Sequence, residues 1–242
     1  LERSAKAIEL DLRHSQDEIK DICQQLIDNC GLRNALFRLY ASRGPGGFTP
    51  NPYDSIGPQM YIVVSSLHQP NESLYERGVK VGFSKVAVKS GGLAKVKTCN
   101  YISNVQMTKE AIDNGYDFVI NITDDGYLGE GATENMVFLT QENDLIFSSF
   151  DHTLRGTTLL RLQELSGELV NLGLIREMKE SKQKTAQLME AKEAFMIGTS
   201  LNALPISEVA GKPVGDGKPG KVAIAARNLL LQDQKVGGHR LI

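Results

Sequence analysis

Cysteine is scarce in this chain, with Cys23, Cys30 and Cys99 the only three among 242 residues. An odd and sparse set provides no disulfide framework and fits a reducing compartment, so we expect a cytoplasmic protein. The four histidines are scattered along the sequence, and no spacing among them resembles a metal site. The sequence therefore predicts neither a disulfide scaffold nor a metal centre.

Long apolar runs and a strong net charge are also lacking. No run is long enough to cross a bilayer, and the formal net charge is -2 with a pI near 6.1. Nucleic acid and anionic membranes are therefore not favoured partners. No signal-peptide pattern is visible, and the sequence from Leu1 is typical of a helix already under way. We expect the natural protein to have more chain before Leu1.

The apolar pattern predicts both helices and strands. Helical spacing covers residues 16–30, 104–114, 158–172, 185–191 and 222–233. Strand-like runs cover residues 35–41, 60–65, 79–83, 118–123, 136–140, 145–148 and 194–197. Hairpins are interspersed among alternating helices and strands, so we predict an α+β protein rather than a doubly wound sheet.

Two domains are predicted from the length and from one polar stretch. Residues 68–73 are polar, include a proline, and form the best linker candidate. They would separate a smaller, incomplete N-terminal α/β domain (1–67) from a larger C-terminal domain (74–242). A chain of 242 residues is long enough for two modest cores.

Four motifs follow one another along the chain. They are Lys-Thr-Cys-Asn-Tyr from Lys97, Gly-Tyr-Leu-Gly-Glu-Gly-Ala-Thr-Glu-Asn from Gly126, Leu-Arg-Gly-Thr-Thr from Leu154, and Phe-Met-Ile-Gly-Thr-Ser from Phe195. A lysine that forms a Schiff base and an acid that pairs with a pyridinium nitrogen are what pyridoxal phosphate chemistry needs from a protein. In this order the motifs resemble the class IV aminotransferase family, the fold-type IV pyridoxal phosphate enzymes, over essentially the whole chain.

The resemblance implies a fold, a cofactor and partners. The fold would be the two-domain α+β fold of fold-type IV enzymes, similar to D-amino-acid aminotransferase, and the cofactor would be pyridoxal 5'-phosphate. A homodimer acting on a small-molecule amino substrate is expected, without a nucleic-acid or membrane partner. The family's phosphate-binding arginine should lie upstream of Leu1.

The same resemblance implies roles for residues around the cofactor. Lys97 would be the Schiff-base lysine and proton shuttle, Glu130 the acid on the pyridine nitrogen, and Tyr101 the hydrogen-bond partner of the phenolic oxygen. Leu154 would pack on one face of the ring. Each residue alone has an ordinary alternative, since a lone lysine before a helix is usually solvated and a turn glutamate is usually exposed.

Thr157 and Thr158 follow a glycine and open a predicted helix. Unpaired N–H groups and the helix dipole make such a terminus an anion site, although a threonine pair there is more often only a cap. The resemblance makes both threonines phosphate contacts, with Thr199 as a further one. It also implies that Ser200 and Leu201 offer backbone N–H groups to the substrate.

Two arginines are candidates for a substrate carboxylate. Arg38 lies in a predicted strand and aligns with a carboxylate contact of the family, and Arg43 follows shortly after it. A guanidinium fork matches carboxylate geometry. A surface arginine on a strand is the ordinary alternative.

The reaction type depends on details outside the shared motifs. The stretches Ser-Arg-Gly-Pro-Gly-Gly from Ser42 and Thr-Ser-Leu-Asn-Ala-Leu-Pro from Thr199 resemble aminodeoxychorismate lyases, whereas Asn-Tyr-Ile from Asn100 resembles branched-chain aminotransferases. We predict a 4-amino-4-deoxychorismate lyase that gives 4-aminobenzoate and pyruvate for folate biosynthesis. A transaminase of branched-chain or D-amino-acid type is the alternative, and a non-catalytic homologue is a third possibility.

Overall fold

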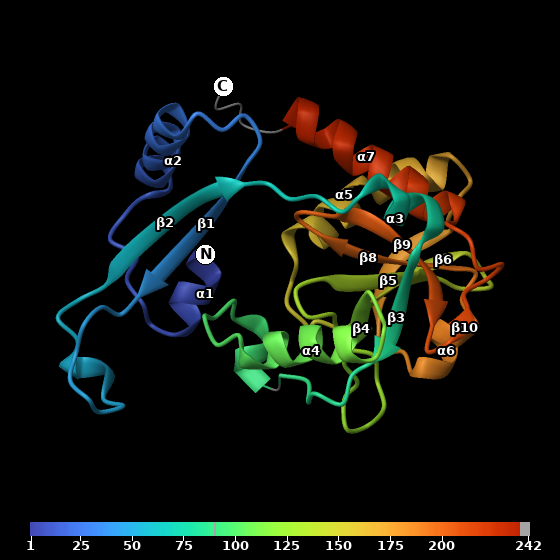
Figure 1. Cartoon of the computed structure of the whole chain (residues 1–242), viewed down its shortest axis with the longest axis horizontal. Coiled ribbons are helices and arrows are strands. Elements are labelled where there is room, and N and C mark those ends of the chain that lie inside the picture. Colours follow the sequence, from blue (N-terminus) through green and yellow to red (C-terminus); the bar gives the residue numbers. More distant parts are fainter. Residues whose placement is uncertain (90, 238–242) are drawn as a thin grey trace. The chain divides into compact units, whose positions relative to one another are not determined.

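The structure is a computed structural model that describes residues 1–89 and 91–237 (Figure 1). These residues form two compact units. Unit 1 comprises Leu1–His68 and Val96–Cys99, and unit 2 comprises residues 69–89, 91–95 and 100–237. Residue 90 and residues 238–242, which belong to the predicted domain 74–242, lie outside the described part. The predicted domain limits themselves stay a prediction.

Unit 1 is built from two helices and a long hairpin. Its elements are α1 (Glu2–Ala7), α2 (Gln16–Cys30), β1 (Ala35–Ser42), the 3-10 helix η1 (Pro52–Asp54) and β2 (Gln59–Ser66). Helix α2 begins at a capping box, in which the Ser15 hydroxyl accepts from the Glu18 N–H and Glu18 accepts in return. It ends at Gly31, whose φ of 67° is the left-handed conformation that favours glycine. Strands β1 and β2 pair antiparallel along their whole length, from Ala35 opposite Ser66 to Ser42 opposite Gln59.

Unit 2 contains a mixed sheet that has eight strands within the described residues. The strand order is β4-β3-β9-β8-β5-β6-β7, with β10 beside β9. The pairs β3–β4, β3–β9 and β6–β7 are parallel, and the remaining pairs are antiparallel. Strand bounds are β3 (Val79–Phe83), β4 (Phe118–Ile120), β5 (Asn135–Leu139), β6 (Asp144–Ser148), β7 (Glu177–Ser181), β8 (Glu193–Gly198), β9 (Asn202–Val209) and β10 (Lys212–Pro213).

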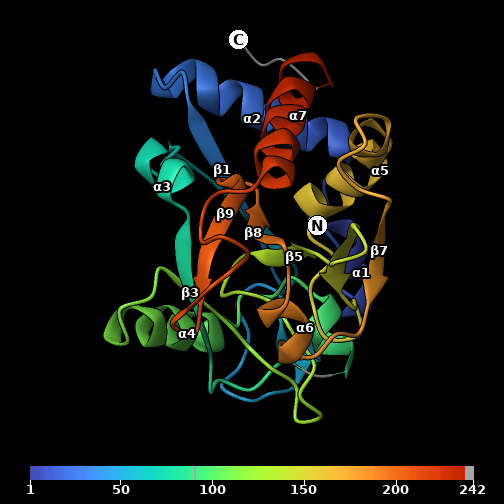
Figure 2. The same cartoon turned by 90° about the vertical axis from the view of Figure 1, so that its right-hand side faces the viewer.

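Helices cover both faces of this sheet because its central strands are apolar on both sides. Along β5, Met136 and Phe138 join one buried cluster, and Val137 and Leu139 join the other. Helices α5 and α7 pack together over the second face (Figures 1 and 2). The helices of unit 2 are α3 (Glu72–Arg77), η2 (Gly91–Lys95), α4 (Ile102–Asp113), α5 (Thr157–Asn171), α6 (Thr185–Met189) and α7 (Lys221–Gly237).

The observed elements follow the sequence pattern closely, with three informative differences. Strand β4 ends at Ile120, three residues before the predicted end. Helix α3 begins at Glu72, inside the stretch predicted as a linker, because the Asn71 side chain accepts from the Ser73 N–H at 3.0 Å and caps it. Strands β7 and β9 were not predicted. The α+β class is confirmed.

Two kinds of feature are absent from the described residues. No helix among residues 1–89 and 91–237 combines the length and apolar character needed to cross a membrane. The same residues contain no group of three or more His, Cys, Asp or Glu side chains arranged to hold a metal ion.

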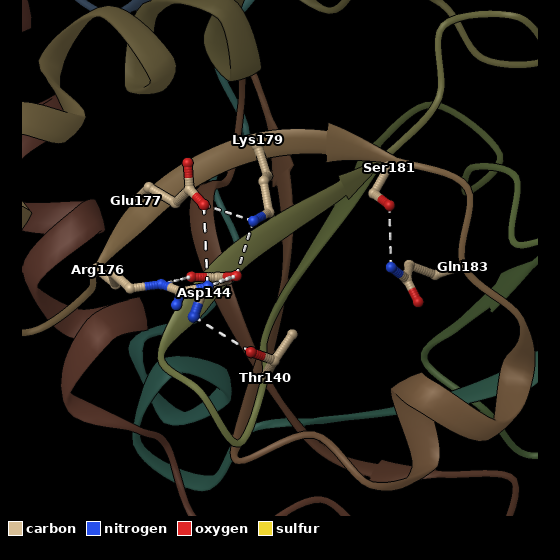
Figure 3. Close-up of polar contacts among 7 residues, drawn as sticks. All are labelled: Thr140, Asp144, Arg176, Glu177, Lys179, Ser181 and Gln183. Atoms are coloured by element: carbon tan, nitrogen blue, oxygen red, sulfur yellow. Dashed lines mark hydrogen bonds and ion pairs between the residues drawn. The ribbon is translucent and has the colours of Figure 1, made fainter.

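The edge strand β7 is fixed to β6 by a buried carboxylate. Asp144 accepts from the Arg176 guanidinium at 2.6 and 2.5 Å and pairs with the Lys179 ammonium at 2.8 Å (Figure 3). Its own N–H donates to the Thr140 hydroxyl at 3.2 Å. The Arg176 hydrogen bonds lower the pKa of Asp144 from 3.8 to about 2, against the opposing effect of burial. This cluster compensates for a strand with only one apolar residue, Met178.

Replacing Asp144 with asparagine tests this edge. The depressed pKa contributes stability that is present above pH 3.8 and is lost as the pH falls through about 2. At pH 7 we expect Asp144→Asn to lose roughly 1–2 kcal/mol, since both cations are partly screened by solvent. Calorimetry should show a Tm lower by about 2–8 °C at pH 7, and the difference should shrink between pH 4 and pH 2. Asp151→Asn, which removes an exposed pair with Lys182, is the control and should leave Tm unchanged. A pH-independent difference would contradict the charge-based account.

Candidate active site

The predicted site residues are divided between the two units. Unit 1 contains Lys97, Arg38 and Arg43, and unit 2 contains the remainder. Those in unit 2 are Tyr101, Glu130, Leu154, Thr157, Thr158, Thr199, Ser200 and Leu201.

In unit 2, four strand ends lie at the same edge of the sheet. Strand β5 begins at Asn135, opposite the end of β8, where Ile197 is its partner. Strand β6 is antiparallel to β5 and therefore ends at this edge, and β9 begins there, with Asn202 opposite Gly198. The three segments that adjoin these ends are 121–134 before β5, 149–156 after β6, and the 199–201 turn between β8 and β9. The motifs of Glu130, Leu154 and Thr199 therefore converge although they are far apart in sequence.

The Glu130 carboxylate is oriented by neutral amides. Its Oε2 accepts from the Leu154 N–H at 3.0 Å and from the Asn135 side-chain amide at 3.2 Å. The same Asn135 amide donates to the Leu154 carbonyl at 3.0 Å. One buried asparagine thus connects the carboxylate to the turn that precedes α5. Hydrogen bonds of this kind favour the ionised form of a carboxylate.

The backbone of Glu130 is fixed on its other side by Asn121. The Asn121 Oδ1 accepts the Glu130 N–H at 2.9 Å, and the Asn121 N–H donates to the Glu130 carbonyl at 3.1 Å. Asn121 is buried, and a Cβ at Gly129 would overlap its Oδ1. Only glycine therefore fits beside this asparagine.

Helix α5 begins immediately beyond this junction. Gly156, its N-cap residue, has no side chain that could cap the helix, so the N–H groups of the first turn have no partner within the helix. Thr157 and Thr158 are the first two helical residues. A Cβ at Gly156 would overlap Asn135 Oδ1, so the helix start lies against the asparagine that binds Glu130. The Glu130 carboxylate and the N-terminus of α5 are therefore fixed relative to one another.

Helix α4 is also tied to the Glu130 loop. Tyr101 is its N-cap residue, and the Lys89 ammonium lies 5.8 Å from the Tyr101 ring centroid. One helical turn later, the Asn104 side chain donates to the Ala132 carbonyl. This contact places the start of α4 beside the loop that contains Glu130.

In unit 1, the Lys97 N–H donates to the Ser4 hydroxyl at 3.0 Å. Arg38 is an exposed residue of β1, opposite Val63. The Arg43 guanidinium donates to the Ile8 carbonyl at 2.5 Å, so this arginine helps to hold α1 against the end of β1. Arg38 therefore remains the better candidate for a substrate carboxylate.

The residues of unit 2 fit the pyridoxal phosphate that the sequence resemblance implies. A carboxylate oriented by amide donors suits a protonated pyridine nitrogen, and an uncapped helix terminus with two threonines suits a phosphate. The overlap that a Cβ would make at Gly156 shows that the junction between the two is closely packed.

Sequence reasoning missed Asn121 and Asn135. Both are buried polar residues at strand ends, where a polar side chain needs a partner. The available signal was an asparagine directly beside an otherwise apolar strand. Glu134 serves its own loop, because it accepts from the Thr133 N–H at 3.0 Å and from the Thr133 hydroxyl.

The Gly156–Asn135 contact gives a prediction about stability. The φ of -61° at Gly156 suits any residue, so only the steric overlap disfavours a Cβ there. We expect Gly156→Ala to displace Asn135, weaken its bonds to Glu130 and Leu154, and lower stability by about 2 kcal/mol. Gly167→Ala in the same helix is the control, because a Cβ there meets nothing within 4 Å and should stabilise the helix by up to about 1 kcal/mol. Equal denaturation midpoints for Gly156→Ala and the parent protein would contradict the contact.

Comparison with known proteins identifies the family. The model of the family described as amino-transferase class IV matches residues 1–209. The chloroplastic D-amino-acid transaminase of Arabidopsis thaliana is 30% identical over 236 residues, which cover 97% of this chain and 62% of that protein. The chain therefore spans less than two thirds of that relative.

Solved structures agree with this assignment. The branched-chain amino acid aminotransferase of Escherichia coli superposes with a TM-score of 0.83 at 26% identity, over 98% of this chain and 76% of that one. The branched-chain amino acid aminotransferase of Thermobaculum terrenum, solved in its pyridoxal phosphate form, has the same fold, with a TM-score of 0.83 at 22% identity, over 96% of this chain and 74% of that chain. Enzymes of this family depend on pyridoxal phosphate. Because the family model matches this chain from Leu1 through the end of strand β9, the chain belongs to the class IV aminotransferases.

Proposed function

We propose that this protein is a pyridoxal phosphate-dependent amino-acid transaminase. The observation that carries the proposal is the fixed pair of Glu130 and the α5 terminus within a class IV aminotransferase fold. The relatives described above are transaminases of D-amino acids and of branched-chain amino acids. This support favours the transaminase alternative over the lyase that the sequence stretches suggested.

Each cofactor contact has an assigned residue. Glu130 would hold the pyridine nitrogen, Thr157, Thr158 and Thr199 the phosphate, Tyr101 the phenolic oxygen, and Leu154 one ring face. The bound cofactor supplies an electron sink for the electrons released at the substrate α-carbon. Glu130 would keep the proton on the ring nitrogen, and its amide donors maintain the carboxylate in position for that task.

Lys97 and the substrate contacts complete the mechanism. The Lys97 amine would hold the cofactor in the absence of substrate. When the substrate amine takes its place, the freed Lys97 amine would accept the proton that leaves the substrate α-carbon and later donate it again. Arg38 and the N–H groups of Ser200 and Leu201 would bind the substrate carboxylate, with Arg43 as a further candidate. A homodimer in the cytoplasm remains part of the proposal.

The lyase prediction rests on the stretches from Ser42 and Thr199, and one assay decides between the two activities. The holoenzyme is given D-alanine or L-leucine with 2-oxoglutarate, and separately aminodeoxychorismate without any oxo acid. We expect amino transfer to 2-oxoglutarate, which gives glutamate, and no product from aminodeoxychorismate alone. Pyruvate and 4-aminobenzoate from aminodeoxychorismate alone would establish the lyase instead. No product in either assay would favour a non-catalytic homologue.

The role of Lys97 gives a second test of the proposal. We expect Lys97→Ala to lose the visible absorbance of the lysine-bound cofactor and to lower turnover by at least about 10²-fold, since both nucleophile and proton shuttle are removed. Lys95→Ala, at the end of η2, is the matched control and should retain both properties. If Lys97→Ala keeps the absorbance and Lys95→Ala loses it, the lysine is misassigned.

A further inference from the structure

The turn proposed to bind substrate is stabilised by two helices, α3 and α7. Residues 199–201 join β8 to β9, and Asn202 directly after them has a φ of 53°, a conformation that few non-glycine residues adopt. Such a turn keeps one geometry only when its surroundings determine it. The contacts of Leu201 and Asn202 therefore decide where the N–H groups of the turn point.

The first of these contacts comes from α3, far away in sequence. The Tyr75 hydroxyl donates to the Leu201 carbonyl at 2.8 Å, and both residues are buried. Because a peptide is planar, fixing this carbonyl fixes the plane of the Leu201–Asn202 peptide, whose N–H belongs to Asn202. The Leu201 N–H lies in the preceding peptide and is restrained through the Cα that the two peptides share. Burial raises the pKa of Tyr75, so its hydroxyl stays protonated and remains a donor at neutral pH.

The second contact comes from α7. The Gln234 side-chain amide donates to Asn202 Oδ1 at 2.7 Å, directly after the Leu201 carbonyl. Asn202 also pairs with Gly198 across the turn, where β8 ends. The end of the turn, at Leu201 and Asn202, is thus hydrogen-bonded to two helices. Gly198, just before the turn, pairs with Asn202 just after it.

The Tyr75 ring is itself oriented by α7. The Arg227 guanidinium lies 3.6 Å from the ring centroid and donates to Glu72 at 2.6 Å, one turn before Tyr75 on α3. Arg227 Nε is buried and has no partner within the described residues, so its hydrogen bonds do not satisfy the whole guanidinium. The guanidinium thus contacts α3 twice, through its ion pair with Glu72 and through its stacking on the Tyr75 ring.

We propose that Tyr75 is a positioning residue for substrate binding, acting through the Leu201 carbonyl on the N–H groups of the 199–201 turn. The inference rests on the proposed function, in which Ser200 and Leu201 bind the substrate carboxylate. Arg227 holds the Tyr75 ring, and Gln234 holds the neighbouring residue. A purely structural tyrosine would instead contribute only its ring to the surrounding apolar cluster.

Tyr75→Phe separates these roles because it keeps the ring and removes only the hydroxyl. On the holoenzyme we expect KM for the amino donor to rise about tenfold with kcat changed by less than about twofold, since carboxylate contacts made in both ground and transition states affect KM alone. The dissociation constant of 4-methylvalerate, a carboxylate that cannot react, should rise by a similar factor. Amide hydrogen exchange across residues 199–202 should accelerate by about tenfold.

Two controls distinguish positioning from general destabilisation. Tyr116→Phe removes a hydroxyl from a half-buried ring that packs on Gly82, and should leave KM and exchange at the turn unchanged. Asp144→Asn lowers Tm through the β6–β7 edge and should also leave KM unchanged. Arg227→Lys, which loses the planar stack, should give an intermediate rise in KM.

Hydrogen exchange at the turn tests the positioning role of Tyr75, and amino transfer by the parent holoenzyme tests the proposed function. Unchanged hydrogen exchange at residues 199–202 in Tyr75→Phe overturns the positioning role, whatever the activity. Faster exchange with unchanged KM and unchanged 4-methylvalerate binding also overturns it, because the turn would then not bind the carboxylate. If the parent holoenzyme transfers no amino group and binds no carboxylate, the proposed function fails, and the positioning role for substrate binding fails with it.

Discussion

The candidate site depends on one interaction, the hydrogen bonds from the Asn135 amide and the Leu154 N–H to the Glu130 carboxylate. Both donors are neutral amide groups, and together they fix the direction of the carboxylate. An acid that must keep a proton on a ring nitrogen needs that combination of negative charge and fixed direction.

Asn135 also determines the geometry of the rest of the cofactor side. Its amide group binds Glu130 and the Leu154 carbonyl, and its Oδ1 leaves no room for a side chain at Gly156. Helix α5 begins at the next residue, so the direction of its first-turn N–H groups follows from the same contact. The residues proposed to contact the ring nitrogen and the phosphate are therefore linked through a strand end and one buried amide.

The sequence predicted most accurately those elements that are bounded by a glycine next to them in the chain. Helix α2 was predicted to the residue because Gly31 ends it, and β3 because alternating apolar residues directly follow Gly78. Strand β7 was missed since it has a single apolar residue and exists through its pairing with β6 and the ion pairs of Asp144. Strand β9 includes Pro205, which argues against a strand within a sheet. For the site, ordered motifs pointed to Glu130 and the threonines, but the roles of Asn121 and Asn135 arise only when separate strand ends meet.

The two halves of the candidate site in unit 2 are supported in different ways. Glu130 and Leu154, two of the proposed cofactor residues, are linked to Asn121 and Asn135 within one continuous stretch, residues 121–156. The 199–201 turn is instead held by Tyr75 of α3 and Gln234 of α7, two helices near the two ends of the unit's sequence. Changes in these helices can therefore shift the substrate contacts while the Glu130–Asn135–Leu154 junction stays intact. A fold that keeps one cofactor chemistry and varies its substrate benefits from this separation, because different residues hold the two parts of the candidate site.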